Sequence, residues 1–197
     1  MKWLGRIAVF LVVVVVFGYA AASAYMYFNQ RSFQYAPEGK FLDLGETLLK
    51  TAEVVEIPTS NNERIRGWYA PPQPGKPVIV YYKGNADSFS DEHVRYEQFV
   101  ADGFGFLAFD YRGFPASPGV LNQENVLKDA VAAYAFAQNK GFPLVIWGRS
   151  LGAGPATFVA KERDARALLL ETPFDSAAAV AKDRYWFLPV DWIMQDT

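Results

Sequence analysis

Four short apolar runs constrain the fold more than any other feature of this sequence. They are "PVIVYY" (77–82), "GFLAFDY" (105–111), "PLVIWG" (143–148) and "ALLLET" (167–172). Runs this short and this apolar are typical of parallel strands that are buried on both faces of a sheet. Stretches with helical periodicity lie between them, at 90–102, 122–140 and 151–163. Strands that alternate with helices predict an α/β fold, with a doubly wound, mostly parallel sheet and helices on both faces.

The segments before these runs differ in character. Residues 31–50 are polar and contain two glycines and a proline, which indicates an irregular connector. Residues 53–72 contain β-branched and aromatic runs on either side of Ser60-Asn61-Asn62, which predicts an antiparallel hairpin. We therefore expect a segment 1–30 that is separate from the fold, a connector 31–50, and an α/β domain over 51–197.

The N-terminal segment has the length of a membrane span. Ile7 to Phe28 is a run of 22 residues without a charge, and a membrane-spanning helix needs about 20. Lys2 and Arg6 precede the run, so the positive-inside rule predicts a single-pass anchor with residues 31 onward on the non-cytoplasmic side. The alternative is a cleaved signal peptide and a secreted protein, because Ala22-Ser23-Ala24 matches a cleavage pattern.

Charge and composition exclude several classes of function. The net charge is −2, the isoelectric point is about 5.5, and no block of lysine or arginine is present, so a nucleic-acid partner is not expected. The chain has no cysteine, which excludes disulfides, cysteine nucleophiles and thiolate metal sites. No metal or organic cofactor is expected.

The segment Gly148-Arg149-Ser150-Leu151-Gly152 matches G-x-S-x-G. An apolar run leads into it and a helical stretch of small residues follows, which is the strand–turn–helix setting that a nucleophile elbow requires. Ser150 is therefore the predicted nucleophile, and the backbone N–H of Leu151 is one predicted oxyanion donor. The alternative is a plain Gly-Ser turn. The segment "YYKGNAD" (81–87) follows the first of the four runs, and its Asn85 N–H is the predicted second donor.

These motifs resemble the α/β-hydrolase superfamily, and among its members the membrane-anchored Bem-like hydrolases. The matching segments are Gly84-Asn85-Ala86, Asp110-Tyr111-Arg112-Gly113 with Ser117 and Gly119, the elbow at 148–152, and Glu171-Thr172-Pro173-Phe174. The resemblance implies a serine hydrolase that cleaves an ester, thioester or amide through an acyl-enzyme, with a small-molecule or lipid/acyl substrate. Two positions depart from the pattern, because Lys83 stands where the family usually has His and Pro115 where it usually has Gly.

Asp110 and Arg112 are close in sequence and polar. We expect them to form an Asp–Arg pair that holds a loop, together with turn hydrogen bonds, and assign them no catalytic role.

A serine nucleophile needs a base, and the chain contains one histidine, His93, upstream of Ser150. In this superfamily the order along the chain is Ser, acid, His, so His93 is interpreted as a solvated helix residue. Glu171 or Asp175 could fill the position that the catalytic acid takes in some relatives. Lys83 is a conceivable substitute base.

The expectation that follows is a C-terminally truncated hydrolase. The catalytic acid and histidine would lie beyond Thr197, two further strands would be missing, and the chain as given would be inactive. The alternative is a non-catalytic, membrane-anchored remnant or binding protein.

Overall fold

The computed structural model describes residues 2–196. They form two compact units: Tyr35–Phe174 is one, and the residues on either side of it make up the other.

A six-stranded mixed sheet dominates the unit of residues 35–174. Its strands are β1 (Glu53–Pro58), β2 (Arg64–Ala70), β3 (Val78–Tyr82), β4 (Gly105–Phe109), β5 (Leu144–Arg149) and β6 (Ala167–Glu171), in the order β1-β2-β4-β3-β5-β6. The first two form the expected hairpin, and β2 pairs antiparallel with β4. The other four are parallel to one another, which confirms the predicted α/β fold.

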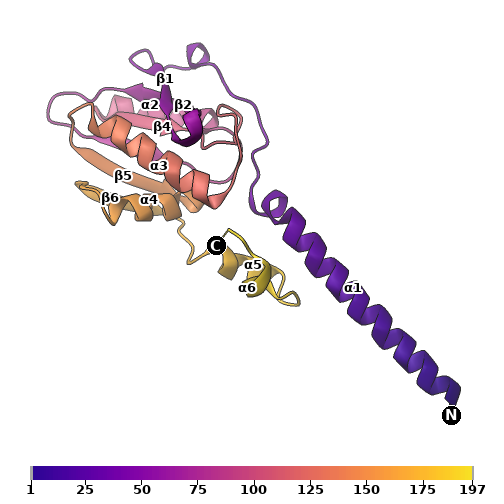
Figure 1. Ribbon diagram of the computed structural model, residues 1–197. Coiled ribbons are helices and arrows are strands. Elements are labelled where there is room, and N and C mark those ends of the chain that lie inside the picture. Colours follow the sequence, from indigo (N-terminus) through magenta and orange to yellow (C-terminus); the bar gives the residue numbers. More distant parts are fainter. Residues whose placement is uncertain (1, 197) are drawn as a thin grey trace. The chain divides into compact units, whose positions relative to one another are not determined.

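Helices cover both faces of this sheet (Figure 1). They are α2 (His93–Ala101), α3 (Gln123–Gln138) and α4 (Ala153–Ala160). Helix α3 begins where predicted, because the side chain of Asn122 accepts a hydrogen bond from the N–H of Asn125 and so caps the helix. Short 3₁₀ turns accompany these helices: η1 (Leu44–Glu46), η2 (Ser60–Asn62), η3 (Phe89–Glu92) and η4 (Ser150–Gly152).

Two hydrophobic cores lie on opposite faces of the sheet, so β3 and β4 are buried throughout. On one face, alternate strand residues pack against α3 and α4, and the core they form includes Val78, Val80, Tyr82, Leu107 and Phe109 from strands and Ala130, Tyr134 and Val159 from helices. On the other face lies an aromatic core. Strands contribute Trp68, Tyr81 and Phe106 to it, η3 contributes Phe89, and α2 contributes Tyr96 and Phe99. This burial on both faces explains why the central strands read as unbroken apolar runs.

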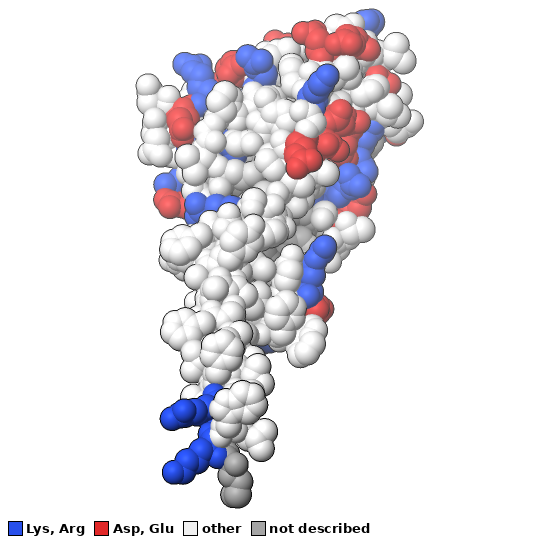
Figure 2. Space-filling view, turned by 90° about the vertical axis from the view of Figure 1, so that its right-hand side faces the viewer, with Lys and Arg blue, Asp and Glu red and all other residues white. Residues whose placement is uncertain are grey.

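The second unit contains α1 (Lys2–Gln34), α5 (Ala177–Arg184) and α6 (Val190–Ile193). Helix α1 extends past residue 30 to Gln34. Its most apolar 18-residue window has a mean hydropathy of 2.5. By length and composition the helix could cross a membrane, and a signal sequence would have the same length and composition. Figure 2 shows an uncharged surface along most of α1, with basic side chains near its N-terminal end, and Arg31 lies in its last turn.

Candidate active site

Ser150 lies in the turn between β5 and α4. Strand β5 ends at Arg149, the 3₁₀ turn η4 starts at Ser150, and α4 begins at Ala153. The φ angle of Ser150 is +49°, in the left-handed region that residues with a side chain rarely adopt. Such strain is maintained only where the surrounding structure enforces it, and it clusters at functional sites.

This turn requires the two glycines of the motif, because neither position has room for a side chain. A Cβ atom at Gly152 would lie 1.9 Å from the carbonyl oxygen of Tyr82. A Cβ atom at Gly148 would lie 2.5 Å from both the Cβ of Ala156 and the carbonyl oxygen of Gly152. The glycines therefore let α4 and the end of β3 pack directly against the turn that carries Ser150.

The loop that follows β3 lies beside this turn. Strands β3 and β5 are parallel neighbours, with Tyr82 opposite Gly148, so their carboxyl ends meet at one edge of the sheet. A Cβ atom at Gly84 would lie 3.8 Å from the Cβ of Ser150. The Asn85 side chain is held by a hydrogen bond of 3.2 Å from the N–H of Ala36. The structure thus brings the segments of Ser150, Leu151 and Asn85 together.

The side chain of Lys83 is buried. It is 1% exposed, and its Nζ donates to the carbonyl oxygen of Asp87 at 2.9 Å. The Nζ also lies 3.7 Å from Asp110 Oδ1 and 3.6 Å from the centre of the Phe114 ring. Burial lowers the pKa of the Lys83 ammonium to about 8, and the carboxylate of Asp110 opposes that shift.

The side chain of Lys83 reaches towards the β4 side of β3, whereas Ser150 lies on the β5 side. Asp110, the ionic partner of Lys83, follows β4, and Ser150 follows β5, while β3 pairs with both strands. This placement does not support Lys83 as a substitute base for Ser150.

Asp110 connects the loop after β3 to the loop after β4. Its carboxylate accepts hydrogen bonds from the Ser88 hydroxyl (2.9 Å), the Phe89 N–H (2.8 Å) and the Ala116 N–H (3.0 Å). Burial raises the pKa of this carboxyl group, and Lys83 and these donors act against the rise.

The predicted pairing of Asp110 with Arg112 is therefore wrong, although both side chains are buried. The Arg112 guanidinium instead lies 2.8 Å from Asp129 Oδ1, on α3, and also pairs with Glu63. Each residue takes its partner from an element distant in sequence, and spacing along the chain carries no signal for that choice.

Glu171, considered above for the catalytic acid, is engaged by cations at the end of β6. Its carboxylate accepts two hydrogen bonds from Arg95 (2.9 and 3.1 Å) and one from Trp147 Nε1 (3.2 Å). The Nε of Arg149 lies 3.4 Å away. These contacts fix the carboxyl end of β6 beside the turn that carries Ser150.

His93 lies at the start of α2, as its interpretation as a helix residue requires. Its Nδ1 is 3.1 Å from the carboxylate of Glu97 on the same helix, and its side chain is 30% exposed. The other alternative for the acid, Asp175, belongs to the second compact unit.

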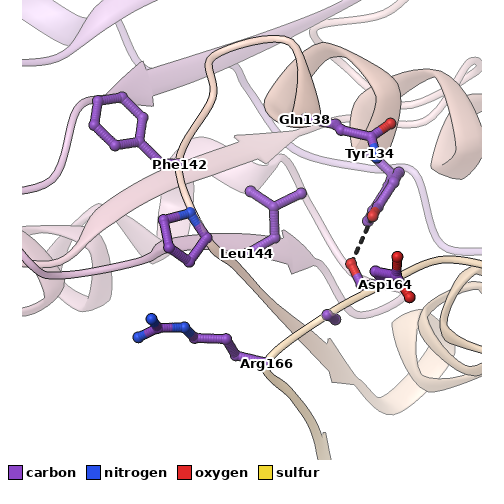
Figure 3. Close-up of a pocket in the computed structure, with 8 residues that line it drawn as sticks. Tyr134, Gln138, Phe142, Leu144, Asp164 and Arg166 are labelled. Atoms are coloured by element: carbon purple, nitrogen blue, oxygen red, sulfur yellow. Dashed lines mark hydrogen bonds between the residues drawn. The ribbon is translucent and has the colours of Figure 1, made fainter.

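A hollow of about 350 Å³ lies at the other end of the strands (Figure 3). Leu144 at the start of β5 and Arg166 just before β6 line it, and the Tyr134 hydroxyl donates to the carbonyl oxygen of Asp164 at 2.6 Å. Ligands of open α/β sheets bind at the carboxyl ends of the strands. This hollow is therefore not the counterpart of the Ser150 site.

Comparisons with known proteins agree with this geometry. The chain is 30% identical over 197 aligned residues to the uncharacterized protein Rv2307c of Mycobacterium tuberculosis, covering 94% of this chain and 69% of the relative. It is 34% identical over 145 residues to the lysophosphatidylserine lipase ABHD12 of Danio rerio, covering 66% of this chain and 38% of the relative. An esterase of Pyrococcus furiosus has the same fold, with a TM-score of 0.61 and 19% identity over 79% of this chain and 63% of that structure. The chain belongs to the α/β-hydrolase superfamily.

The relatives are longer than this member of the superfamily. The chain spans 63% and 69% of the two mycobacterial proteins that it matches, and just over a third of the ABHD12 proteins. No model of a protein family matches the chain.

Proposed function

We propose that this chain carries the nucleophile and the oxyanion hole of a serine hydrolase that cleaves ester, thioester or amide bonds. The observation that carries the proposal is the strained Ser150, at φ +49° between β5 and α4, with Gly148 and Gly152 packed against their neighbours. A Gly-Ser turn with only a connecting role would need no such strain.

The proposed chemistry uses one side chain and two backbone groups. The Oγ of Ser150 attacks the substrate carbonyl carbon, and its proton passes to a general base. The N–H groups of Leu151 and Asn85 donate to the oxyanion that forms. The tetrahedral intermediate collapses to an acyl-enzyme as the alcohol, thiol or amine leaves with a proton, and water then releases the acid.

The described residues 2–196 offer no side chain that we assign as the base. His93 is engaged with Glu97, and the Lys83 ammonium faces Asp110.

We propose a substrate with an acyl chain, such as a lipid ester. The support is twofold: the relative in Danio rerio is named a lysophosphatidylserine lipase, and α1 is apolar enough to lie in a membrane. A membrane-anchored hydrolase meets its lipid substrates at the bilayer surface.

We further propose that α1 is an uncleaved single-pass anchor, with the residues after it on the non-cytoplasmic side. The support is the charge-free run of 22 residues and the lysine and arginine that precede it. An alkaline phosphatase fused after Lys40 should be active outside the cytoplasm and stay with the membrane fraction. Phosphatase activity only inside would contradict the orientation, and release of the fusion would favour a cleaved signal.

The nucleophile is tested by labelling the full-length natural protein in its membrane with a fluorophosphonate probe. The wild type should be labelled, and Ser150→Ala should lose labelling and ester hydrolysis by about 10³-fold or more. Ser32→Ala is the matched control, because that exposed hydroxyl only donates to the carbonyl of Asn29 on its own helix. Undiminished labelling of Ser150→Ala, or no labelling of the wild type, would refute the proposal; the second result would favour a non-catalytic binding protein.

A further inference from the structure

The C-terminal segment of the unit that contains α1 carries two highly exposed tryptophans. Trp186 is 79% exposed and Trp192 is 90% exposed, and Phe187 between them is 52% exposed. Helix α6 and the turn before it carry these side chains, while Val190 in the same segment is buried. Exposed apolar side chains grouped in this way mark an interaction surface.

Hydrogen bonds fix this segment at the C-terminal part of α1. The side chain of Gln30 donates to the carbonyl of Ile193 (3.1 Å) and accepts from the N–H of Gln195 (2.7 Å). Beside it, the guanidinium of Arg31 pairs with Asp196 at 3.2 Å. Gln30 is 5% exposed and Asp196 is 4% exposed, so these contacts are built into the unit.

The position of these contacts along α1 sets their level in a bilayer. The apolar run ends at Phe28 and the polar Asn29 follows it. The 22 helical residues of the run span about 33 Å, close to the thickness of the hydrocarbon core. Gln30 and Arg31 follow directly and therefore lie at the headgroups. Tryptophan is enriched at that depth, since its ring is apolar and its N–H is a donor.

We propose that the segment Tyr185–Met194 is a second membrane contact, which lies in the headgroup region beside the exit of α1, with Trp186 and Trp192 inserted. The proposal rests on the membrane anchor proposed above. It commits to a lipid surface because hydrogen bonds join the segment to the end of the span.

The charges of this region indicate how it binds. Lys182, Asp183, Arg184 and Asp191 sum to zero, and Lys182 pairs with Asp191 at 2.7 Å. Insertion is therefore driven by the aromatic side chains, and neutral phosphatidylcholine vesicles suffice for it.

The absence of cysteine makes the test direct. The full chain is reconstituted in phosphatidylcholine vesicles with a single nitroxide label at Phe187→Cys, and collisions with oxygen and with a water-soluble nickel complex are compared. Oxygen concentrates in lipid and the nickel complex stays in water. The label at 187 should collide more with oxygen, and that preference should be lost when Trp186→Ser and Trp192→Ser are added.

Two control labels separate this proposal from the anchor. Val13→Cys lies in the middle of the charge-free run and should be deep in lipid, while Glu124→Cys, 74% exposed on α3, should be aqueous. A label at 187 that behaves like the one at 124, or is shielded from both reagents, overturns the proposal, and shielding would mean packing against protein. Retention of the lipid signature in the double serine variant overturns it as well. An aqueous label at 13 would instead overturn the anchor, and with it this contact.

Discussion

Replacing Lys83 by methionine should change how the stability of the unit of residues 35–174, here called the sheet domain, depends on pH. The ammonium is almost completely buried, against Asp110 and the ring of Phe114. Burial lowers its pKa from the ordinary 10.5 to about 8 in the folded protein. Between these two values the unfolded chain binds one proton more than the folded chain, so the free energy of unfolding rises with pH.

The magnitude follows from the size of the shift. Each pKa unit corresponds to about 1.4 kcal/mol, so the contribution of Lys83 grows by about 3 kcal/mol between pH 8 and pH 10.5. Below pH 8 Lys83 is charged in both the folded and the unfolded chain, so it does not make the free energy of unfolding depend on pH. Lys83→Met lacks the titrating group and should lack this rise.

The assay is urea unfolding of the full chain in detergent at a series of pH values, followed by tryptophan fluorescence. Trp68 and Trp147 both lie in the sheet domain and report on it. Subtracting the unfolding free energy of Lys83→Met from that of the wild type at each pH cancels the contributions of the groups that titrate in both proteins. Lys40→Met removes an exposed lysine and should give a curve parallel to the wild type. A wild-type curve parallel to that of Lys83→Met over pH 8–10.5 would refute the reasoning.

Two further predictions concern stability, each with a matched control and each measured by thermal melting. Gly152→Ala should destabilise the domain by about 3 kcal/mol or more, because its Cβ meets a backbone oxygen at 1.9 Å, whereas Gly154→Ala, with open space around it, should be neutral or stabilising by up to about 1 kcal/mol; equal melting temperatures would contradict the packing described. Asp129→Ala leaves the buried Arg112 without its main partner and should destabilise by about 3–5 kcal/mol, whereas Glu124→Ala removes an exposed carboxylate and should leave the melting temperature unchanged; a mild effect of Asp129→Ala would show that Arg112 finds another partner.

The central strands could be predicted from sequence because burial on both faces leaves a plain signal. Strands β3 and β4 themselves contain no charged residue that would interrupt burial. The same expectation was wrong for the run of β6, which lies at the edge of the sheet with Leu168, Leu169 and Leu170 exposed. The cap of α3 could also be predicted, since Asn122 stands directly before the periodic stretch and bonds locally.

The sequence does not reveal which buried charges pair with each other, or that the C-terminal segment forms short helices. Asp110 pairs with Lys83 and Arg112 with Asp129, and such partners are chosen by tertiary packing. The short helices α5 and α6 were not predicted, because eight- and four-residue helices depend on their neighbours for stability. The roles of Ser150, Leu151 and Asn85 remain predictions from motif and geometry.

The strand order has a consequence for the way the site is built during synthesis. Strand β3 pairs with β4 and also with β5, and β5 is synthesised only after α3. The loop after β3 and the turn at the end of β5 therefore meet late, through contacts far apart in sequence, which form slowly. Until then the β5-facing edge of β3 is open, and we expect a chaperone, or rapid arrival of β5, to protect it from wrong pairing.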